Sequence, residues 1–227
     1  LGTSRGPQDA AEIVKSLIRH KINILFIIGG DGSMKAASAI YDEITRLGVK
    51  IAVIGIPKTI DNDINFIPQS FGFETAVEKA TEALHCAHTE AESVINGIGL
   101  VRLMGRESGF IAATASLSLR EVNFVLVPEV PFTLDGERGL LPALEKRLKK
   151  RKHALIVVAE GAGQELLNHA VGKDISGNRI LGDISSFLIQ SIKSYFSNKN
   201  IPYTMKYIDP SYMIRSVPAN VNDRRHC

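Results

Sequence analysis

Short apolar runs rich in β-branched residues alternate with longer amphipathic stretches along the whole chain. The apolar runs predict strands at residues 23–28, 50–54, 99–104, 124–127, 154–159 and 203–208. The amphipathic stretches predict helices at residues 7–21, 34–47, 73–92, 108–119, 139–151 and 183–197. Strands that alternate with helices predict an α/β fold, with mostly parallel sheets and helices on both faces. The continuous apolar character of residues 23–28 predicts a strand that is buried on both faces.

The composition limits the kinds of partner that the protein can have. Hydrophobic residues make up 44% of the 227 residues, and the formal net charge is only +3. So balanced a charge argues against nucleic acid or a membrane surface as the main partner. No apolar run approaches the roughly 20 residues that span a bilayer. The two cysteines, Cys86 and Cys227, exclude a disulfide framework and favour a reducing compartment, and we expect Cys86 in the core.

Ligands of parallel α/β sheets bind where strands end, so the residues after each predicted strand are candidate site residues. The segment Gly29-Gly30-Asp31-Gly32-Ser33 follows the first strand. Glycines let a backbone approach a phosphate closely, and amides at the start of the next helix can bind its oxygens. Asp31 would repel that anion unless a cation such as Mg²⁺ lies between them, and Ser33 could cap the helix. The alternative is an ordinary strand-to-helix turn.

Acidic and hydroxyl side chains cluster after the second strand, in residues 57–63. Asp61 and Asp63 are two residues apart, so in an extended segment they would point the same way. One carboxylate could take a proton from a hydroxyl while the other helps to hold a metal, and Thr59 could orient either. The alternative is a turn with solvated side chains.

Further candidates follow the later strands. Arg106 stands at a strand-to-helix junction, where it could bind an anion or form a salt bridge with Glu107. Glu160 could accept hydrogen bonds from substrate hydroxyls or cap a turn. Tyr212 and Arg215 are three residues apart, so on a helical turn they would share a face and could hold a second phosphate.

Together these segments resemble the signature blocks of the phosphofructokinase family. The blocks are Gly-Gly-Asp-Gly at 29–32, Pro-Lys-Thr-Ile-Asp-Asn-Asp at 57–63, Met-Gly-Arg at 104–106 and Tyr-x-x-Arg at 212–215, in family order. The resemblance covers essentially the whole chain, and segments 1–6, 102–106 and 206–215 look most like the plant ATP-dependent group. It implies two similar lobes with Rossmann-like layers and a site in the cleft between them.

The resemblance also implies an activity and a set of site residues. The activity is transfer of the γ-phosphate of ATP to the 1-hydroxyl of fructose 6-phosphate in glycolysis, with Mg²⁺ as cofactor. The catalytic residues would be Asp61 as general base, Thr59 and Arg106. The ATP phosphates would bind Arg5, Gly30, Asp31, Gly32, Ser33 and Lys58, with Asp31 also holding the metal. Fructose 6-phosphate would contact Thr59, Asp61, Asp63, Met104, Gly105, Arg106 and Glu160, and its 6-phosphate Lys206, Tyr212 and Arg215.

The phosphoryl donor depends on two of these positions. Pyrophosphate-using relatives usually carry Asp at the position of Gly32 and Lys at the position of Lys58, and the acid crowds the space that an α-phosphate needs. Here Gly32 leaves that space open while Lys58 is present, a pair typical of plant and trypanosome ATP-using enzymes. ATP is therefore expected, and a pyrophosphate-dependent fructose 6-phosphate 1-phosphotransferase is the alternative.

The chain starts after a glycine-rich strand and turn that the family uses for the nucleotide, and it stops shortly after the Tyr-x-x-Arg block. We therefore expect a piece of a longer chain, truncated at both ends. A non-catalytic regulatory subunit is a further alternative, as is a lipid or NAD kinase, which the 57–63 and 104–106 blocks disfavour. Residues 1–130 are expected to form the nucleotide and Mg-phosphate lobe, and residues 131–227 the sugar-phosphate lobe. The family likeness implies an allosteric homo- or hetero-oligomer, a tetramer, in the cytoplasm or alternatively in a plastid.

Overall fold

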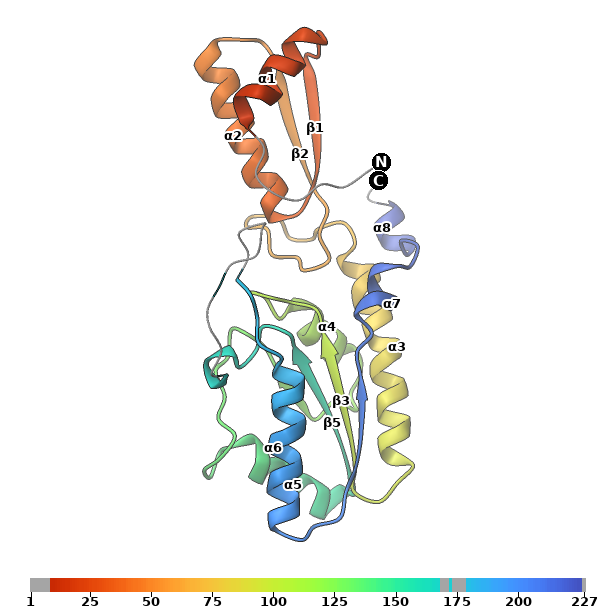
Figure 1. Cartoon of the computed structure of the whole chain (residues 1–227). Helices are drawn as coiled ribbons and strands as arrows, with labels where there is room; N and C mark the ends of the chain where they lie inside the picture. Colours follow the sequence, from red (N-terminus) through yellow and green to blue (C-terminus); the bar gives the residue numbers. More distant parts are fainter. Residues whose placement is uncertain (1–8, 168–171, 173–178, 226–227) are drawn as a thin grey trace. The chain divides into compact units, whose positions relative to one another are not determined.

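The computed structural model describes residues 9–167, 172 and 179–225, and the chain divides into two compact units (Figure 1). Unit 1 comprises residues 1–71 and 171–180, and unit 2 comprises residues 72–170 and 181–227. The elements are α1 (Ala10–Arg19), β1 (Ile24–Gly29), α2 (Asp31–Leu47), β2 (Ala52–Pro57), α3 (Phe73–Glu92), β3 (Gly97–Leu103), α4 (Phe110–Ser118), β4 (Phe124–Leu126), α5 (Leu140–Arg151), β5 (His153–Ala159), the 3₁₀ turn η1 (Gln164–Leu166), α6 (Ile184–Asn198), β6 (Thr204–Ile208), α7 (Ser211–Arg215) and α8 (Val221–Arg225).

In unit 1, two parallel strands, β1 and β2, pack one face against two helices. The carboxylate of Asp9 accepts a hydrogen bond from the amide of Ala11 at 2.8 Å and so caps the start of α1. The end of α2 is Gly48, whose φ of 64° only glycine adopts readily. The core of this unit consists of Val14, Leu17, Ile40, Ile44 and Ile51, against which Leu25, Ile27 and Val53 pack.

The other face of the β1–β2 pair is exposed in the described part of unit 1. Ile24 is 51% exposed, Phe26 and Ile28 are each 58% exposed, and Ile54 is 41% exposed. The prediction that this strand is buried on both faces is therefore wrong for the residues that the structure describes. An apolar run shows that both faces of a strand are apolar, but α1 and α2 both pack on the same face.

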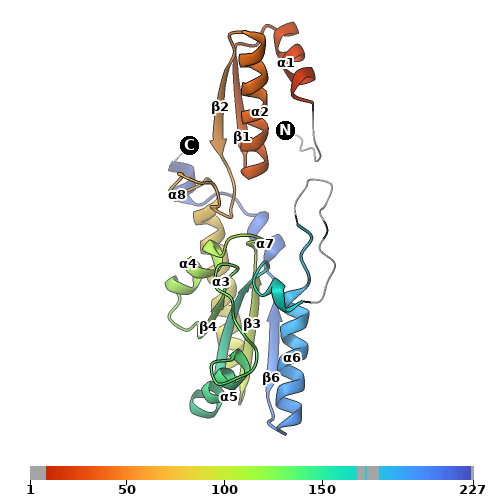
Figure 2. The same ribbon diagram turned by 90° about the vertical axis from the view of Figure 1, so that its left-hand side faces the viewer.

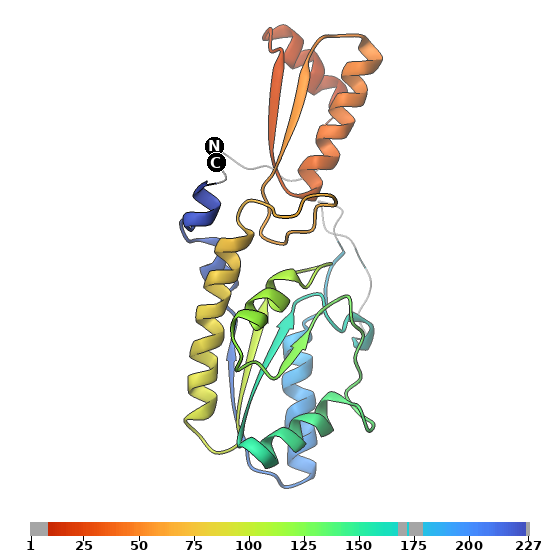
Figure 3. The same ribbon diagram turned by 180° about the vertical axis from the view of Figure 1, so that it is seen from behind.

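In unit 2, four parallel strands form a sheet in the order β4-β5-β3-β6. β3 pairs with β5 over its whole length and with β6 from Gly97 to Val101. Figure 2 shows α4 and α6 on opposite sides of this sheet, and α3 runs beside β6 (Figure 3). Residues on both sides of position 130 build this one sheet, so the expected lobes 1–130 and 131–227 do not coincide with the compact units. As a division by ligand, those lobes stay a prediction.

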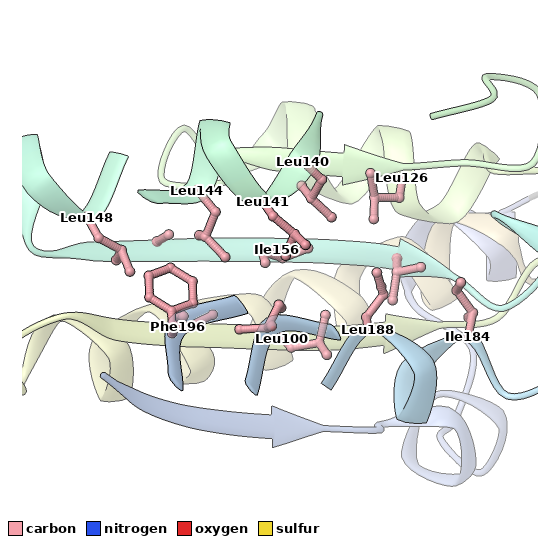
Figure 4. Close-up of a cluster of buried hydrophobic side chains, with 14 of the residues drawn as sticks. Leu100, Leu126, Leu140, Leu141, Leu144, Leu148, Ile156, Ile184, Leu188 and Phe196 are labelled. Carbon is pink, nitrogen blue, oxygen red and sulfur yellow. The ribbon is translucent and has the colours of Figure 1, made fainter. Parts of the chain in front are cut away.

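Helices α5 and α6 bury a large apolar cluster against one face of this sheet (Figure 4). Each such Leu, Ile or Phe side chain contributes about 1.5–3 kcal/mol when it leaves water. The cluster therefore fixes the sheet whose strand ends carry the candidate site. Its labelled members are Leu100, Leu126, Leu140, Leu141, Leu144, Leu148, Ile156, Ile184, Leu188 and Phe196.

The start of α3 is fixed by a residue far along the chain. Asp223 in α8 is 3% exposed and accepts hydrogen bonds from the amides of Gly72 and Thr75, each at 2.9 Å, and from the Thr75 hydroxyl. Gly72, at the N-cap with a φ of 100°, has no side chain to do this. The segment around Asp223 is thereby held on the start of α3.

The predicted α/β class is confirmed, and the six predicted strands and six predicted helices are all present, α3 with the predicted bounds and the others with one or both ends shifted. The first helix begins at Ala10, and the expected proline start at Pro7 lies outside the described residues. Cys86 is exposed rather than in the core, because Leu84 and Ala87 define the buried stripe of α3 on either side of it. In the described residues, no helix is long and apolar enough to cross a membrane.

Candidate functional site

The carboxyl ends of β1 and β2 bring the glycine turn and the acidic segment together in unit 1. The amide of Lys58 donates to the carbonyl of Gly29 at 2.9 Å. A Cβ added to Gly30 would lie 3.3 Å from the Cβ of Thr59, so the turn and Thr59 are in contact. Parallel pairing explains this contact, because both strands end at the same edge.

Helix α2 begins at Asp31, three residues before the predicted start. Gly30 is its N-cap, and Ser33 lies inside the first turn, so the prediction that Ser33 caps the helix is wrong. A Cβ on Gly29 would lie only 2.1 Å from the Oγ of Ser33, so this glycine makes room for the hydroxyl. A glycine cap has no side chain to satisfy the first amides of the helix, and such amides can bind an anion.

Neither packing nor backbone conformation requires a glycine at position 32. A Cβ on Gly32 would meet no atom within 4 Å, and its φ lies outside the left-handed region. The first turn of α2 is therefore open at this point, with room for a ligand to approach the backbone.

Two carboxylates lie near the ammonium group of Lys35. The Oδ2 of Asp31 is 2.6 Å from the Nζ of Lys35. This hydrogen bond, together with the charges of Asp31 and Asp63, raises the pKa of Lys35. Mg²⁺ usually takes one or two protein carboxylates and fills its shell with phosphates and water, so this donor set fits the ion. In the described parts of the chain, no group of three or more His, Cys, Asp or Glu side chains could hold a metal by itself.

Hydrogen bonds from Ser70 close the loop between Lys58 and Phe71. The amide of Ser70 donates to the Oδ1 of Asn62 at 2.7 Å, and its hydroxyl donates to the carbonyl of Thr59 at 2.7 Å. Ser70 is 1% exposed, and the amide of Phe71 returns to the β2 strand end. The acidic segment is therefore part of a loop that hydrogen bonds hold closed.

Asp61 and Asp63 have different surroundings. The amide of Asp61 donates to the Oγ1 of Thr59 at 3.2 Å. Asn62 has a φ of 53°, so the segment bends there, and the extended geometry expected for the two acids is wrong. Asp61 is half-buried with its Oδ1 shielded from solvent, whereas Asp63 is exposed. Carboxylates in unlike environments can take unlike roles.

In unit 2, two glycines interlock the turns that follow β3 and β5. Gly105 has a φ of 130°, and its carbonyl accepts a hydrogen bond from the amide of Gly161 at 3.0 Å. A Cβ on Gly161 would lie 1.7 Å from the carbonyl oxygen of Arg106, a clash that only glycine avoids. The structure thereby brings Met104, Gly105, Arg106 and Glu160 to one edge of the sheet.

Gln164 forms hydrogen bonds that hold the turn at Glu160. It is 5% exposed, its Nε2 donates to the carbonyl of Glu160 at 3.0 Å, and its Oε1 accepts from the amide of Gly182 at 2.9 Å. The turn is thus tied to the segment that enters α6. Sequence analysis missed Gln164 because a single glutamine has no pattern in the sequence that indicates its hydrogen-bond partners.

Tyr212 and Arg215 lie on α7, so the predicted helical turn is confirmed. Both side chains are exposed, Tyr212 by 84%, whereas Ile214 between them is 3% exposed and anchors the helix. Two polar side chains therefore project from an anchored turn, where a ligand could reach them.

Lys206 lies in the middle of β6 rather than at its end. It pairs in register with Gly99, and its Nζ is 3.6 Å from a carboxylate oxygen of Glu90 on α3. The ladder continues to Ile208 before the strand ends. A role in phosphate binding stays a prediction for Lys206. To bind a phosphate, its ammonium group would either break the ion pair with Glu90 or contact both groups at once.

The candidate residues thus fall into two groups, one in each unit. Unit 1 holds Gly30, Asp31, Gly32, Ser33, Lys58, Thr59, Asp61 and Asp63, and unit 2 holds Met104, Gly105, Arg106, Glu160, Lys206, Tyr212 and Arg215. Arg5 lies outside the described residues. Sequence analysis also missed Lys35, although its position four residues after Asp31 on a helix is a signal for an ion pair.

Comparison with known proteins identifies relatives for the whole chain. The sequence model of the family "Phosphofructokinase" matches residues 1–227. ATP-dependent 6-phosphofructokinase 1 of Arabidopsis thaliana is 53% identical over 232 residues, which cover 100% of this chain and 49% of the relative. The ATP-dependent 6-phosphofructokinase of Borreliella burgdorferi is 52% identical over 234 residues, covering 100% of this chain and 52% of the relative. The chain therefore spans about half the length of the curated relatives it matches.

A solved structure shares the fold. The pyrophosphate-dependent phosphofructokinase from Marinobacter aquaeolei superimposes with a TM-score of 0.76, covering 99% of this chain and 54% of that one. The two sequences are only 23% identical, so this likeness shows the fold alone.

Proposed function

Because the chain belongs to the phosphofructokinase family, we propose that it carries the catalytic centre of an ATP-dependent 6-phosphofructokinase. The reaction transfers the γ-phosphate of ATP to the 1-hydroxyl of fructose 6-phosphate and yields fructose 1,6-bisphosphate and ADP, a step of glycolysis. The relatives from Arabidopsis thaliana and Borreliella burgdorferi are both named as ATP-dependent enzymes of this kind.

The observation that carries the proposal is the contact between the glycine turn and the acidic loop. Gly30, at the start of α2, lies against Thr59, and Thr59 holds the backbone of Asp61. An anion bound at the helix start would therefore lie next to a half-buried carboxylate. Phosphoryl transfer needs this pair of features: a site for the phosphates and a proton acceptor beside it.

In the proposed mechanism, Asp61 accepts the proton of the sugar hydroxyl as that hydroxyl attacks the γ-phosphate. Thr59 keeps Asp61 in place, and Asp63 supports it. The first amides of α2, with Gly30, Gly32, Ser33 and Lys58, bind the phosphates of the donor. The protein thus supplies position and charge neutralisation rather than a covalent intermediate.

The sugar phosphate would bind the residues of unit 2. Arg106 and the Met104–Gly105 turn would hold the sugar with Glu160, which can accept hydrogen bonds from hydroxyls. Tyr212 and Arg215 on α7 would bind the 6-phosphate, since a guanidinium fork suits phosphate oxygens. The exposure of both side chains supports this role.

Asp31 would hold Mg²⁺, with Asp63 nearby. When bound, the ion neutralises charge on the phosphates of the donor. The ion pair between Asp31 and Lys35 shows that this carboxylate already faces a cation. Lys35 then adds a second positive charge to the phosphate site.

Gly32 supports ATP as the donor, because its position is open and no packing in the described residues accounts for the glycine. Lys58 remains the observation in favour of pyrophosphate as the alternative donor. A non-catalytic regulatory subunit stays the second alternative. A tetrameric assembly and a cytoplasmic location stay predictions; a relative with a chloroplastic name leaves the plastid as the alternative.

The test is formation of fructose 1,6-bisphosphate with Mg²⁺ and either ATP or pyrophosphate, on the chain and on its Asp61→Asn variant. The substitution keeps the size of the side chain but removes the proton acceptor, so the rate should fall by about 10²–10⁴-fold. Asp42→Asn is the matched control, because Asp42 is an exposed carboxylate on α2. Its rate should match that of the unchanged chain.

Each outcome of this assay supports or excludes one of the candidate functions. Activity with ATP that collapses only in Asp61→Asn supports the kinase. Activity with pyrophosphate alone would replace ATP as the donor. A folded chain that binds neither fructose 6-phosphate nor ATP in calorimetry would overturn the proposal and favour the non-catalytic alternative.

A further inference from the structure

Arg102 occupies a strand position that faces the core. Leu100 and Ile98, two and four residues earlier in β3, are 0% exposed and belong to the cluster under α5 and α6. Side chains two residues apart in a strand point to the same face, so Arg102 continues this apolar row at the carboxyl edge of the sheet. Burying a charge in such a place costs free energy unless the charge is paired, so the partner of Arg102 shows which part of the fold this residue holds.

The partner of Arg102 is Asp209, the residue that follows β6. The Nη2 of Arg102 is 2.8 Å from the Oδ2 of Asp209, and the side chains are 26% and 31% exposed. The register explains the pairing, because Val101 lies opposite Ile208 at the end of the ladder. A charge-assisted hydrogen bond in this partly buried setting is stronger than a surface ion pair.

A second carboxylate, Asp183 at the start of α6, also interacts electrostatically with Arg102. Burial raises the pKa of Asp183, but hydrogen bonds from Ser186 and Ser185 and the charge of Arg102 outweigh that effect and lower it. The guanidinium therefore lies close to the ends of three elements of unit 2: β3, β6 and α6.

Asp209 also forms hydrogen bonds with the first residue of α7. Its Oδ1 accepts hydrogen bonds from the amide of Ser211 at 3.1 Å and from the Ser211 hydroxyl at 2.5 Å. Helix α7 has only five residues, too few to be stable by its own hydrogen bonds. Its direction depends on two anchors, the buried Ile214 and this Asp209 contact.

We propose that Arg102 is a positioning residue that acts through Asp209 to hold α7, so that Tyr212 and Arg215 face the phosphate group of the sugar phosphate. The proposal rests on the proposed function for the identity of that ligand. Arg102 itself need not touch the ligand, since its Nη2 is engaged by Asp209. Without the ion pair, α7 keeps only its Ile214 anchor and its two polar side chains lose their fixed direction.

The test compares Arg102→Met, Asp209→Asn and the double variant with the unchanged chain. Calorimetry with fructose 6-phosphate, without nucleotide, measures the dissociation constant. Loss of a hydrogen bond between charged groups should weaken binding about tenfold in each single variant. Because both variants break the same contact, the double variant should be no weaker than the singles. Arg46→Met is the matched control, since it breaks an arginine–glutamate pair in unit 1, and it should bind like the unchanged chain.

Amide hydrogen exchange gives a readout that does not depend on any ligand. Ser211 and Ile214 donate to Asp209 and Pro210, and their amides should exchange at least about tenfold faster in both single variants but not in Arg46→Met. Unchanged exchange there would overturn the proposal. Faster exchange with unchanged sugar-phosphate affinity would also overturn it, because α7 would then be loosened without consequence for binding. If the unchanged chain does not bind fructose 6-phosphate, the proposed ligand is wrong, while the exchange data still report whether Arg102 holds α7.

Discussion

Three glycines of the candidate site differ in whether the folded chain requires a glycine at that position. Gly161 is required by a neighbouring carbonyl, and Gly105 by a φ of 130°. Gly32 has neither reason, since a Cβ there meets no atom within 4 Å. A glycine without a reason in the folded chain is best explained by something that binds against it.

The substitution Gly32→Asp should therefore separate stability from donor binding. The carboxylate would enter the first turn of α2, where a negative charge contributes about 0.3–1 kcal/mol of helix stability, and loss of a helical glycine adds to this. The same carboxylate would stand where the donor phosphates bind, so the affinity for ATP should fall at least about tenfold. Thermal unfolding and calorimetry with ATP measure the two effects.

Ala39→Asp is the matched control, because it adds the same charge on an exposed position two turns further along α2. It should leave ATP affinity within about twofold of the unchanged chain. Weaker ATP binding in both variants would point to net charge rather than to the space at Gly32. Unchanged ATP binding in Gly32→Asp would remove the structural argument for ATP as the donor.

Individual residues also mark the limit of prediction from sequence. The position of most candidate residues at the ends of strands could be predicted, because the strand patterns locate those ends within a few residues. The predicted cap at Ser33 was wrong because α2 begins at Asp31 with Gly30 as its N-cap, although serine is the better N-cap residue. The pairing of Lys206 with Glu90 depends on which helix face meets β6, which only packing determines.

At the scale of elements, α5 and α6 are joined by one carboxylate. Glu145 on α5 accepts hydrogen bonds from the Tyr195 hydroxyl at 2.7 Å and from Lys199 at 2.6 Å, both on α6, and pairs with Lys149 at 2.5 Å. The hydrogen bonds from Lys149, Lys199 and Tyr195 lower the pKa of Glu145 from 4.5 to about 2. A network of this kind contributes more than a single surface pair.

This network predicts a defined pH dependence of stability. A carboxylate whose pKa is lowered by folding stabilises the protein fully above its ordinary pKa, and this stabilisation is lost as the pH falls through the folded-state pKa. Glu145→Gln should therefore lower the melting temperature at pH 7 by about 2–4 °C. The difference from the unchanged chain should shrink between pH 4.5 and about 2, as scanning calorimetry can show.

The control is Glu165→Gln, which removes an exposed carboxylate from the same unit. It should change the melting temperature little at any pH. A Glu145→Gln effect that is as large at pH 2 as at pH 7 would mean that packing of the side chain, rather than its charge, joins the two helices.

The elements were predictable to different degrees, for physical reasons. α3 runs from Phe73 to Glu92 as predicted, because a long 3.6-residue pattern survives any surroundings. The burial of β1 was not predictable, because an apolar run does not reveal which faces other elements cover. The cap of α3 by Asp223 joins residues about 150 positions apart, and no local pattern records such a contact.

At the scale of the whole molecule, the two units differ in how completely they bury their strands. In unit 2, β3 and β5 are buried along nearly their whole length. In unit 1, β1 and β2 bury one face and leave Phe26, Ile28 and Ile54 exposed. Because strand burial supplies most of the stabilisation of a sheet, local opening should be much easier in unit 1.

Native-state hydrogen exchange should therefore rank the strands. Amides in the centre of β3 and β5, such as those of Leu100 and Ile156, should exchange only through global unfolding. Amides that bond across the β1–β2 pair, such as those of Ile27 and Ile54, should exchange at least about a hundredfold faster, and the gap should close as denaturant is added. If Ile27 and Leu100 instead exchanged at one common rate, the exposed face of β1 would have to be covered in solution. That outcome would require a partner surface on this face. The substitution Phe26→Ser should then weaken the contact with that surface, so that exchange in β1 becomes fast while exchange in β3 stays unchanged.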